Sequence, residues 1–81
     1  MTGRRHVIVH PADTVATLLD NETATATLDD GRPCALGVPF GHKVALCAMK
    51  PMDSVVKYGV QIGTATRRIE SGDHVHVHNC H

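Results

Sequence analysis

Turn-forming residues recur about every ten positions along this chain, and they leave room only for short strands between them. The interruptions lie at residues 11–13, 29–31, 37–41, 50–53, 59 and 70–73. The segments between them are rich in Val, Ile and Thr, which make up 21 of the 81 residues. These β-branched side chains suit a pleated sheet better than a helix. The spacing and the composition together predict an all-β fold with at most one short helix.

The predicted strands lie at residues 5–10, 15–20, 23–28, 32–36, 42–48, 54–58, 61–66 and 74–79. Two of these segments are ambiguous. Residues 15–20 also suit a short helix capped by Asp13 or Thr14, although we favour a strand, and residues 61–66 can be an extended piece or one helical turn. Residues 29–31, Asp-Asp-Gly, predict a hairpin turn, and Pro33 places the returning strand at a sheet edge or a bulge.

A chain of 81 residues is long enough for one domain, which we place at residues 1–81. At this size a hydrophobic core supplies only about 3–5 kcal/mol, so a metal or a partner subunit is the usual addition. The three cysteines show no CxxC spacing, which indicates a reducing compartment rather than a disulfide framework.

The charge balance argues against two classes of partner. Eight basic and eight acidic side chains cancel, so we expect neither nucleic acid nor an anionic membrane surface to bind. No apolar run approaches the roughly 20 residues of a membrane span, and the first residues do not resemble a signal peptide. We therefore expect a cytoplasmic protein.

Histidine is the unusual component, with seven in the chain and four among the last eight positions. If residues 74–79 form one strand, His74, His76 and His78 share a face, while Val75 and Val77 point into the core. Imidazole is a common ligand of divalent metals, and two histidines spaced i and i+2 on a strand can reach one ion. The alternative is a solvated polar strand face without a ligand.

Lys43 follows Gly41 and His42 at the start of a strand, where a cation can meet a carboxylate. An ordinary surface lysine at a loop-to-strand junction is the simpler alternative. Of the neighbours Lys57 and Tyr58, we expect the tyrosine to be packed in the core. We likewise expect Cys47 to be buried filler rather than a nucleophile.

Four motifs in this order resemble the SAF domain of the altronate and galactarate dehydratase family. They are His10-Pro11-x-Asp13, Gly41-His42-Lys43-Val44-Ala45-Leu46, Lys57-Tyr58-Gly59-x-x-Ile62-Gly63-x-Ala65 and Ile69-x-x-Gly72-x-His74-Val75-His76-Val77-His78-Asn79. The resemblance implies a β-clip fold of short, sharply bent strands. In that family the domain precedes a large catalytic domain or forms a separate small subunit.

The same resemblance implies a β-elimination that removes water or sulfite from a hydroxy acid such as altronate, galactarate or sulfolactate. The reaction would use a divalent metal, commonly Fe²⁺ with Mn²⁺ as an alternative, shared with a large catalytic subunit. The implied site residues are His76 and His42 as catalytic groups, Lys43, Lys57 and Asn79 for the substrate, and His76 and His78 for the metal.

The resemblance also sets expectations for assembly. The domain should be inactive alone and should bind tightly to the large subunit. Independently of the resemblance, a sheet of 81 residues with few aromatic side chains should leave strand edges and apolar surface uncovered, so we expect a dimer or larger oligomer when it is alone. Two rival interpretations remain open at this point: a stand-alone SAF-type module for carbohydrate binding or assembly, and a protein that binds metal through its histidine tail alone. The shortage of aromatic residues, 2% of the chain, argues against a sugar-binding surface.

Overall fold

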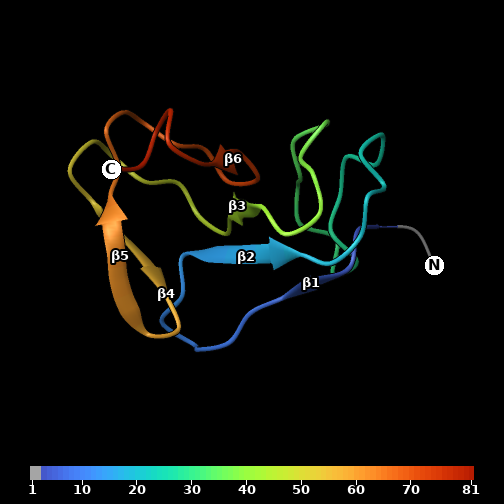
Figure 1. The fold of residues 1–81 in the computed structure, drawn as a ribbon, viewed down its shortest axis with the longest axis horizontal. Helices are drawn as coiled ribbons and strands as arrows, with labels where there is room; N and C mark the ends of the chain where they lie inside the picture. Colours follow the sequence, from blue (N-terminus) through green and yellow to red (C-terminus); the bar gives the residue numbers. More distant parts are fainter. Residues whose placement is uncertain (1–2) are drawn as a thin grey trace.

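The computed structural model describes residues 3–81, which form short antiparallel strands and no helix (Figure 1). The strands are β1 (His6–Val7), β2 (Val15–Leu18), β3 (Lys43–Ala45), β4 (Ser54–Lys57), β5 (Val60–Thr64) and β6 (His74–Val75). The all-β prediction is confirmed, and both ambiguous segments contain a strand: β2 within residues 15–20, and β5 over most of residues 61–66. No helix among the described residues is long and apolar enough to cross a membrane.

The strands form two sheets. A four-stranded antiparallel sheet has the order β1-β2-β3-β6, and β4 and β5 form a separate two-stranded hairpin. In Figure 1 the hairpin stands at one end of the larger sheet, close to the C-terminus. This arrangement of short strands is consistent with the β-clip fold that the resemblance implies.

The larger sheet separates two small hydrophobic cores, because successive residues of a strand face opposite sides. Neighbours on β2 show this: Val15 lies in one core and Ala16 in the other. The core shared with the hairpin contains Val15, Ala45, Met49, Val55, Ala65, Ile69 and Val75. The second core contains Ala16, Leu18, Leu28, Cys34, Val38 and Val44. Small and β-branched side chains therefore fill both cores.

The turn predicted at residues 29–31 is present, but the strands predicted on either side of it are wrong. The Leu28 N–H donates to the Arg32 carbonyl at 2.8 Å, and one isolated bridge joins Thr27 to Pro33. Proline has no N–H to donate, so the ladder does not continue through this position. The segments at residues 23–28 and 32–36 are otherwise irregular.

The carboxylate of Asp13 explains why β1 ends at Val7 rather than at residue 10 as predicted. It accepts hydrogen bonds from the N–H groups of Val9 at 3.3 Å and His10 at 3.1 Å, and from that of Gly59 at 2.8 Å. A side chain that binds nearby N–H groups competes with the sheet ladder for them. Burial acts to raise the pKa of Asp13, but these N–H groups outweigh it and hold that pKa below its ordinary value. Asp13 thus ties the β1–β2 loop to the hairpin turn.

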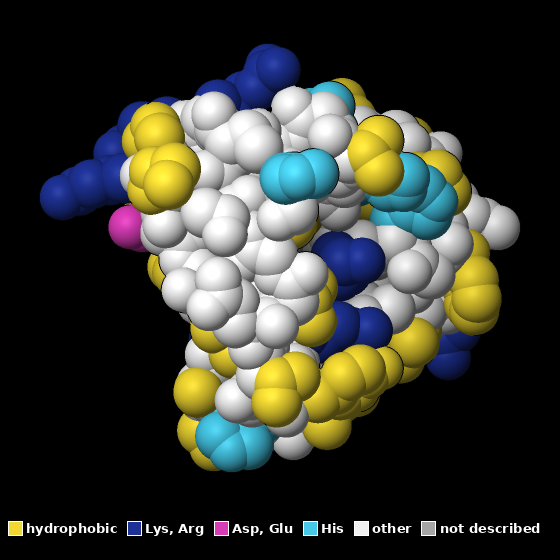
Figure 2. Space-filling model, turned by 60° about the vertical axis from the view of Figure 1, so that its left-hand side comes forward, with side chains coloured by type: hydrophobic (Ala, Val, Ile, Leu, Met, Phe, Trp, Pro, Cys, Tyr) yellow, Lys and Arg dark blue, Asp and Glu magenta, His cyan; other side chains and the backbone are white. Residues whose placement is uncertain are grey.

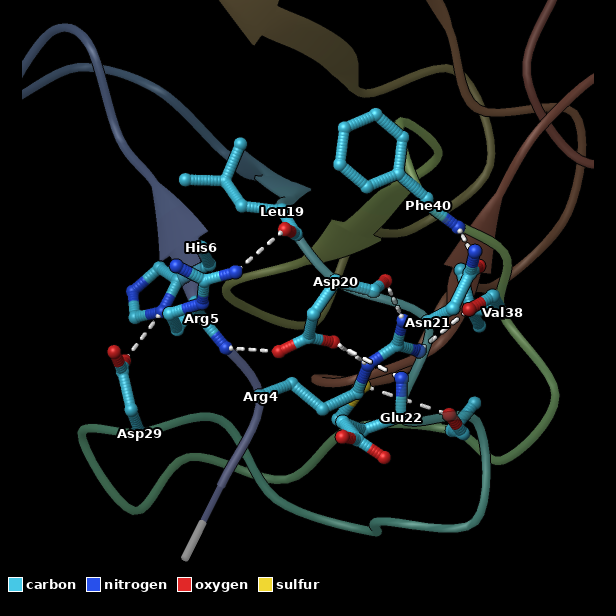
Figure 3. Close-up of polar contacts among 12 residues, drawn as sticks. Arg4, Arg5, His6, Leu19, Asp20, Asn21, Glu22, Asp29, Val38 and Phe40 are labelled. Carbon is cyan, nitrogen blue, oxygen red and sulfur yellow. Dashed lines mark hydrogen bonds and ion pairs between the residues drawn. The ribbon is translucent and has the colours of Figure 1, made fainter. Parts of the chain in front are cut away.

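A buried arginine fixes the other end of the molecule (Figure 3). Arg4 is fully buried, and its Nε donates to Asp20 Oδ1 at 2.9 Å. Its remaining guanidinium nitrogens donate to the backbone carbonyls of Asp20 and Val38. A buried charge is tolerated only when it is paired and hydrogen-bonded, as this one is.

The last residues of the chain form an additional short ladder along the hairpin. Thr64 and His81 exchange two backbone hydrogen bonds of 2.9 Å, and the Thr66 N–H donates to the Asn79 carbonyl at 2.9 Å. Gly63 permits this close approach, because a Cβ there would lie 2.8 Å from the His81 carbonyl oxygen. The C-terminal segment is therefore held against β5.

Candidate functional site

Four histidines gather at one end of the larger sheet, and the pairing of β3 with β6 brings them together. The register pairs Val44 with His74 and Lys43 with Val75. One step further along the same antiparallel register, His42 lies opposite His76. Directly opposite side chains are the closest neighbours across a pair of strands, and diagonal ones remain within reach of a ring. We call His42, His74, His76 and His78 the histidine cluster.

The rings of the cluster are in direct contact. His42 stacks on His76, with ring centroids 4.8 Å apart and planes inclined by 12°. His42 Nδ1 lies 2.9 Å from His74 Nε2, within hydrogen-bond distance. The His74 ring is also 5.5 Å from the rings of His76 and His78. His74 is therefore the central member, although the sequence motifs assign it no role in the site.

Burial lowers the pKa of His74 below its ordinary value. Repulsion from His42, His76, His78 and Lys43 acts in the same direction, because each disfavours a further positive charge. His74 is thus held neutral more firmly than a solvated histidine.

The strand predicted at residues 74–79 is wrong beyond Val75, because Asn79 folds the chain into a turn. Asn79 Oδ1 accepts from the His76 N–H at 3.0 Å, and its Nδ2 donates to the His74 carbonyl at 2.8 Å. Val77 lies on this turn with 84% of its surface exposed, so its predicted burial is wrong, whereas Val75 is fully buried as predicted. His76 and His78 consequently do not share a strand face.

A hollow of about 220 Å³ opens beside the cluster. Its lining is formed by Lys43, Ile62, Val75, His76, Val77, Cys80 and His81. Figure 2 shows Lys and Arg side chains within a recess, hydrophobic side chains along its rim and histidines near its edge. The lining contains no acidic side chain, so no Asp or Glu repels a carboxylate or another anion there.

The structure brings together some of the predicted site residues and separates others. Lys43 and His76 line the hollow, and His42 stacks on His76. His78 does not line the hollow and joins the cluster through the ring of His74. Lys57 does not line the hollow; its Nζ lies 3.0 Å from the hydroxyl of Tyr58 and 4.3 Å from that ring's centroid.

The position of Asn79 also differs from that of a substrate-facing group. Its side chain is buried, and both its oxygen and its nitrogen are used within the turn. It therefore holds the segment that carries His76 and His78. That local role leaves no obvious periodic signal in the sequence, although the Asx residues common in turns provide a hint.

Two predictions about burial are wrong. Tyr58 is 56% exposed because it occupies the hairpin turn, and Cys47 is exposed in the bend that follows β3. Cys80 and Ile62, which sequence reasoning left out of the site, both line the hollow.

Imidazole nitrogens are suitable ligands for the divalent metal that the resemblance implies. The rings of His76 and His78 make no hydrogen bond within residues 3–81, and both residues are exposed. Within the same residues, however, no group of three or more His, Cys, Asp or Glu side chains is arranged to hold an ion. The imidazoles of His76 and His78 therefore suit a metal chemically but supply only part of its coordination shell.

Comparison with known proteins agrees with this fold and these motifs. Residues 4–81 match the altronate/galactarate dehydratase SAF domain. The chain is 35% identical to altronate dehydratase of Escherichia coli (strain K12), over 93% of this chain and 16% of that protein. It is 54% identical to the (2R)-sulfolactate sulfo-lyase subunit alpha of Paracoccus pantotrophus, over 53% of this chain and 64% of that subunit.

Altronate dehydratase of Bacillus subtilis (strain 168) is 56% identical over 48% of this chain, which is 8% of that protein. The chain thus spans less than two thirds of the length of each of these relatives. Because the family match covers nearly all of the described residues, the chain belongs to the SAF-domain family of altronate and galactarate dehydratases.

Proposed function

We propose that this chain is the SAF part, a small subunit or an N-terminal domain, of a metal-dependent lyase that eliminates water or sulfite from a hydroxy acid. The observation that carries the proposal is the histidine cluster next to Lys43 at the edge of an open hollow. The relatives named above are an altronate dehydratase from each of two organisms and a subunit of a sulfolactate sulfo-lyase, which supports both leaving groups.

Lys43 would bind the carboxylate of the substrate. Its side chain is half-buried and lines the hollow, where no acidic residue competes for its ammonium group. Removal of a proton next to a carboxylate builds negative charge on that carboxylate. A fixed cation stabilises this charge more than it stabilises the ground state.

His42 would transfer a proton to the leaving hydroxyl, and His76 would take part in proton transfer through the ring nitrogen that does not bind the metal. Their stacked rings lie together at the start of β3, and His76 also lines the hollow. Histidine is the most common general acid or base because its pKa is near neutrality. Asn79 would act by holding the turn in place.

A divalent metal, Fe²⁺ or Mn²⁺, would supply a Lewis acid for the carboxylate and the leaving oxygen. His76 and His78 are the ligands that the resemblance implies, and their free imidazoles support this assignment. Because residues 3–81 hold no complete set of ligands, the other ligands would come from the catalytic part of the enzyme.

A catalytic partner would also cover the apolar surface around the hollow. Val60, Ile62 and Val77 are 59%, 43% and 84% exposed, and two of them line the hollow. Exposed apolar residues grouped beside a polar site are typical of a protein interface. Among the described residues, the backbone of residues 60–63 pairs only with β4, apart from the Gly63 carbonyl, which accepts from Gln61 Nε2 at 3.3 Å. This edge would therefore be open to a partner strand.

The test is turnover by this chain purified together with the catalytic chain of its own organism. Altronate, galactarate and sulfolactate are each supplied with Fe²⁺ or Mn²⁺. The measured quantity is the dehydrated acid for the first two substrates and sulfite for the third. We expect one of these acids to be turned over, and His76→Ala to lower kcat at least about 100-fold.

The matched control is His10→Ala, which removes an exposed histidine outside the hollow and should leave kcat unchanged. The absence of turnover with all three acids, or full activity of His76→Ala, contradicts the proposal.

A further inference from the structure

We infer that His74 is a positioning residue for His42: it fixes the orientation of that ring and determines which of its nitrogens carries the proton. The inference deepens the proposed function, since it rests on His42 as a proton-transfer group. Its geometry, however, can be tested without turnover.

The two rings face each other through their nitrogens. His42 Nδ1 and His74 Nε2 are 2.9 Å apart, while the ring centroids are 5.1 Å apart. This centroid separation is close to the largest that such a nitrogen–nitrogen distance permits. The nitrogens therefore point at each other, as in a near-linear hydrogen bond, which is the strong geometry.

One proton must be shared in this contact. A neutral imidazole has one N–H donor and one bare acceptor nitrogen, so one of the two rings donates and the other accepts. With Nδ1 of His42 used in this way, only its Nε2 is left to meet a substrate. The state of Nε2 is set by the contact: it is bare when Nδ1 donates, and it carries the proton when Nδ1 accepts.

His74 is itself held firmly enough to orient another ring. It is half-buried on β6, opposite the fully buried Val44, and its carbonyl accepts a hydrogen bond from Asn79 Nδ2 at 2.8 Å. His76 covers one face of the His42 ring at a 4.8 Å centroid separation. His42 is thus restrained along one edge by His74 and on one face by His76.

A ring held in this way loses less orientational freedom when it reacts. Misplacement of a reacting group by about 1 Å can cost roughly 100-fold in rate. His78 offers the contrast, because its ring lies 5.5 Å from that of His74 and forms no hydrogen bond within residues 3–81.

The first measurement is nuclear magnetic resonance of the ¹⁵N-labelled chain at mildly alkaline pH, where imidazoles are neutral. We expect a scalar coupling across the hydrogen bond between His42 Nδ1 and His74 Nε2. We also expect the two nitrogens of His42 to have the separate shifts of a single tautomer. His78→Phe should preserve both signals, and His74→Phe should shift His42 toward the mixture of tautomers seen in a solvated histidine.

The second measurement is steady-state kinetics of the complex with the catalytic chain. His74→Phe should lower kcat roughly 10- to 100-fold while KM changes by less than about 2-fold. His74→Gln, which can still donate to or accept from Nδ1, should recover part of the loss. His10→Phe is the matched control and should retain full kcat.

Absence of the nitrogen–nitrogen coupling in the wild-type chain overturns the inference, as does an unchanged kcat in a folded His74→Phe variant. If His74→Phe does not fold, the wild-type coupling and the kinetics of His74→Gln decide. A wild-type complex that turns over none of the three acids rejects the proposed function. The nitrogen spectrum still decides whether His74 holds His42.

Discussion

Two valines separated by one residue show how sharply the environment changes along the C-terminal segment. Val75 is fully buried between β3 and the hairpin core, whereas Val77 lies on the turn with 84% of its surface exposed. We predict that Val75→Ala lowers the free energy of unfolding by about 1–2 kcal/mol, because it removes two buried methyl groups and leaves a cavity. Val77→Ala should change it by less than about 0.5 kcal/mol. Urea unfolding of both variants measures these changes. Equal losses of unfolding free energy would contradict the exposed position of Val77 on the turn.

The ion pair of Arg4 with Asp20 gives a prediction about acid. The hydrogen bond from Arg4 lowers the pKa of Asp20 below its ordinary value of 3.8. A carboxyl group whose pKa is lower in the folded state contributes stability above the unfolded value. That contribution is lost as the pH falls through the folded value.

We therefore expect Asp20→Asn to be about 1–2 kcal/mol less stable than the wild type at neutral pH. The difference should shrink as the pH falls below 3.8. Thermal melts of both proteins across this range measure it, and a difference that does not depend on pH would show that Asp20 acts through shape rather than charge.

Among the structural elements, the turn of the β4–β5 hairpin carries a strained residue. Tyr58 and Gly59 connect paired Lys57 and Val60, and both have positive φ, 57° and 74°. A two-residue turn of this kind needs positive φ at both positions and therefore prefers Asn-Gly. At the first position tyrosine is sterically less favourable than asparagine. Tyr58→Asn should raise the free energy of unfolding by about 0.5–1 kcal/mol, reduced by the lost contact with Lys57. A lower melting temperature would instead show that the Lys57–Tyr58 contact outweighs the strain.

The C-terminal ladder depends on a residue without a side chain. A Cβ at Gly63 would lie 2.8 Å from both the His81 carbonyl oxygen and Cys80 Sγ. Gly63→Ala should therefore separate residues 79–81 from the hairpin and speed amide exchange at Thr64 and His81. Val60→Ala on the same strand is the control, since its side chain is 59% exposed and lies at the far end of β5 from the ladder. Unchanged exchange in Gly63→Ala would mean that the ladder adjusts without opening.

The strands are predictable from the sequence where apolar alternation and turn residues agree. They are not predictable where a side chain hydrogen-bonds the backbone groups that would otherwise pair in a sheet. The alternation located β2 and β3, although the strands end at Leu18 and Ala45 rather than at the predicted residues 20 and 48, and it assigned Val75 to the core as observed. The same alternation continues to residue 79, but Asn79 binds the backbone of residues 74 and 76 and ends the strand. Nothing in a two-residue period reveals that competition.

The candidate site was partly predictable for a similar reason. The motifs identified His42, Lys43 and His76 because the family pattern includes them. The central place of His74 follows from the register of β3 with β6, which joins segments about 30 residues apart. A single sequence does not contain that register, so the contact between His42 and His74 emerged only in the structure.

At the scale of the whole molecule, the uncovered apolar surface predicts association. Val60, Ile62 and Val77 are exposed near the hollow, next to the edge of β5 at residues 60–63, where the described chain supplies no second strand. We expect the isolated chain to form a dimer or a larger oligomer that gives way to a complex with the catalytic chain. Sedimentation velocity should show Ile62→Lys shifted toward the monomer. A monodisperse wild-type monomer at high concentration would contradict the prediction.

The pairing of His81 with Thr64 has a practical consequence for anyone who produces this protein. His81 lines the hollow together with His76, so a segment fused after His81 begins beside the histidine cluster. A polyhistidine purification tag at that end would add foreign imidazoles beside His76, where they could capture nickel or iron and imitate a native metal site. The tag should therefore be attached before β1, which Figure 1 draws on the side of the molecule opposite the C-terminus, and be removed before any metal is titrated.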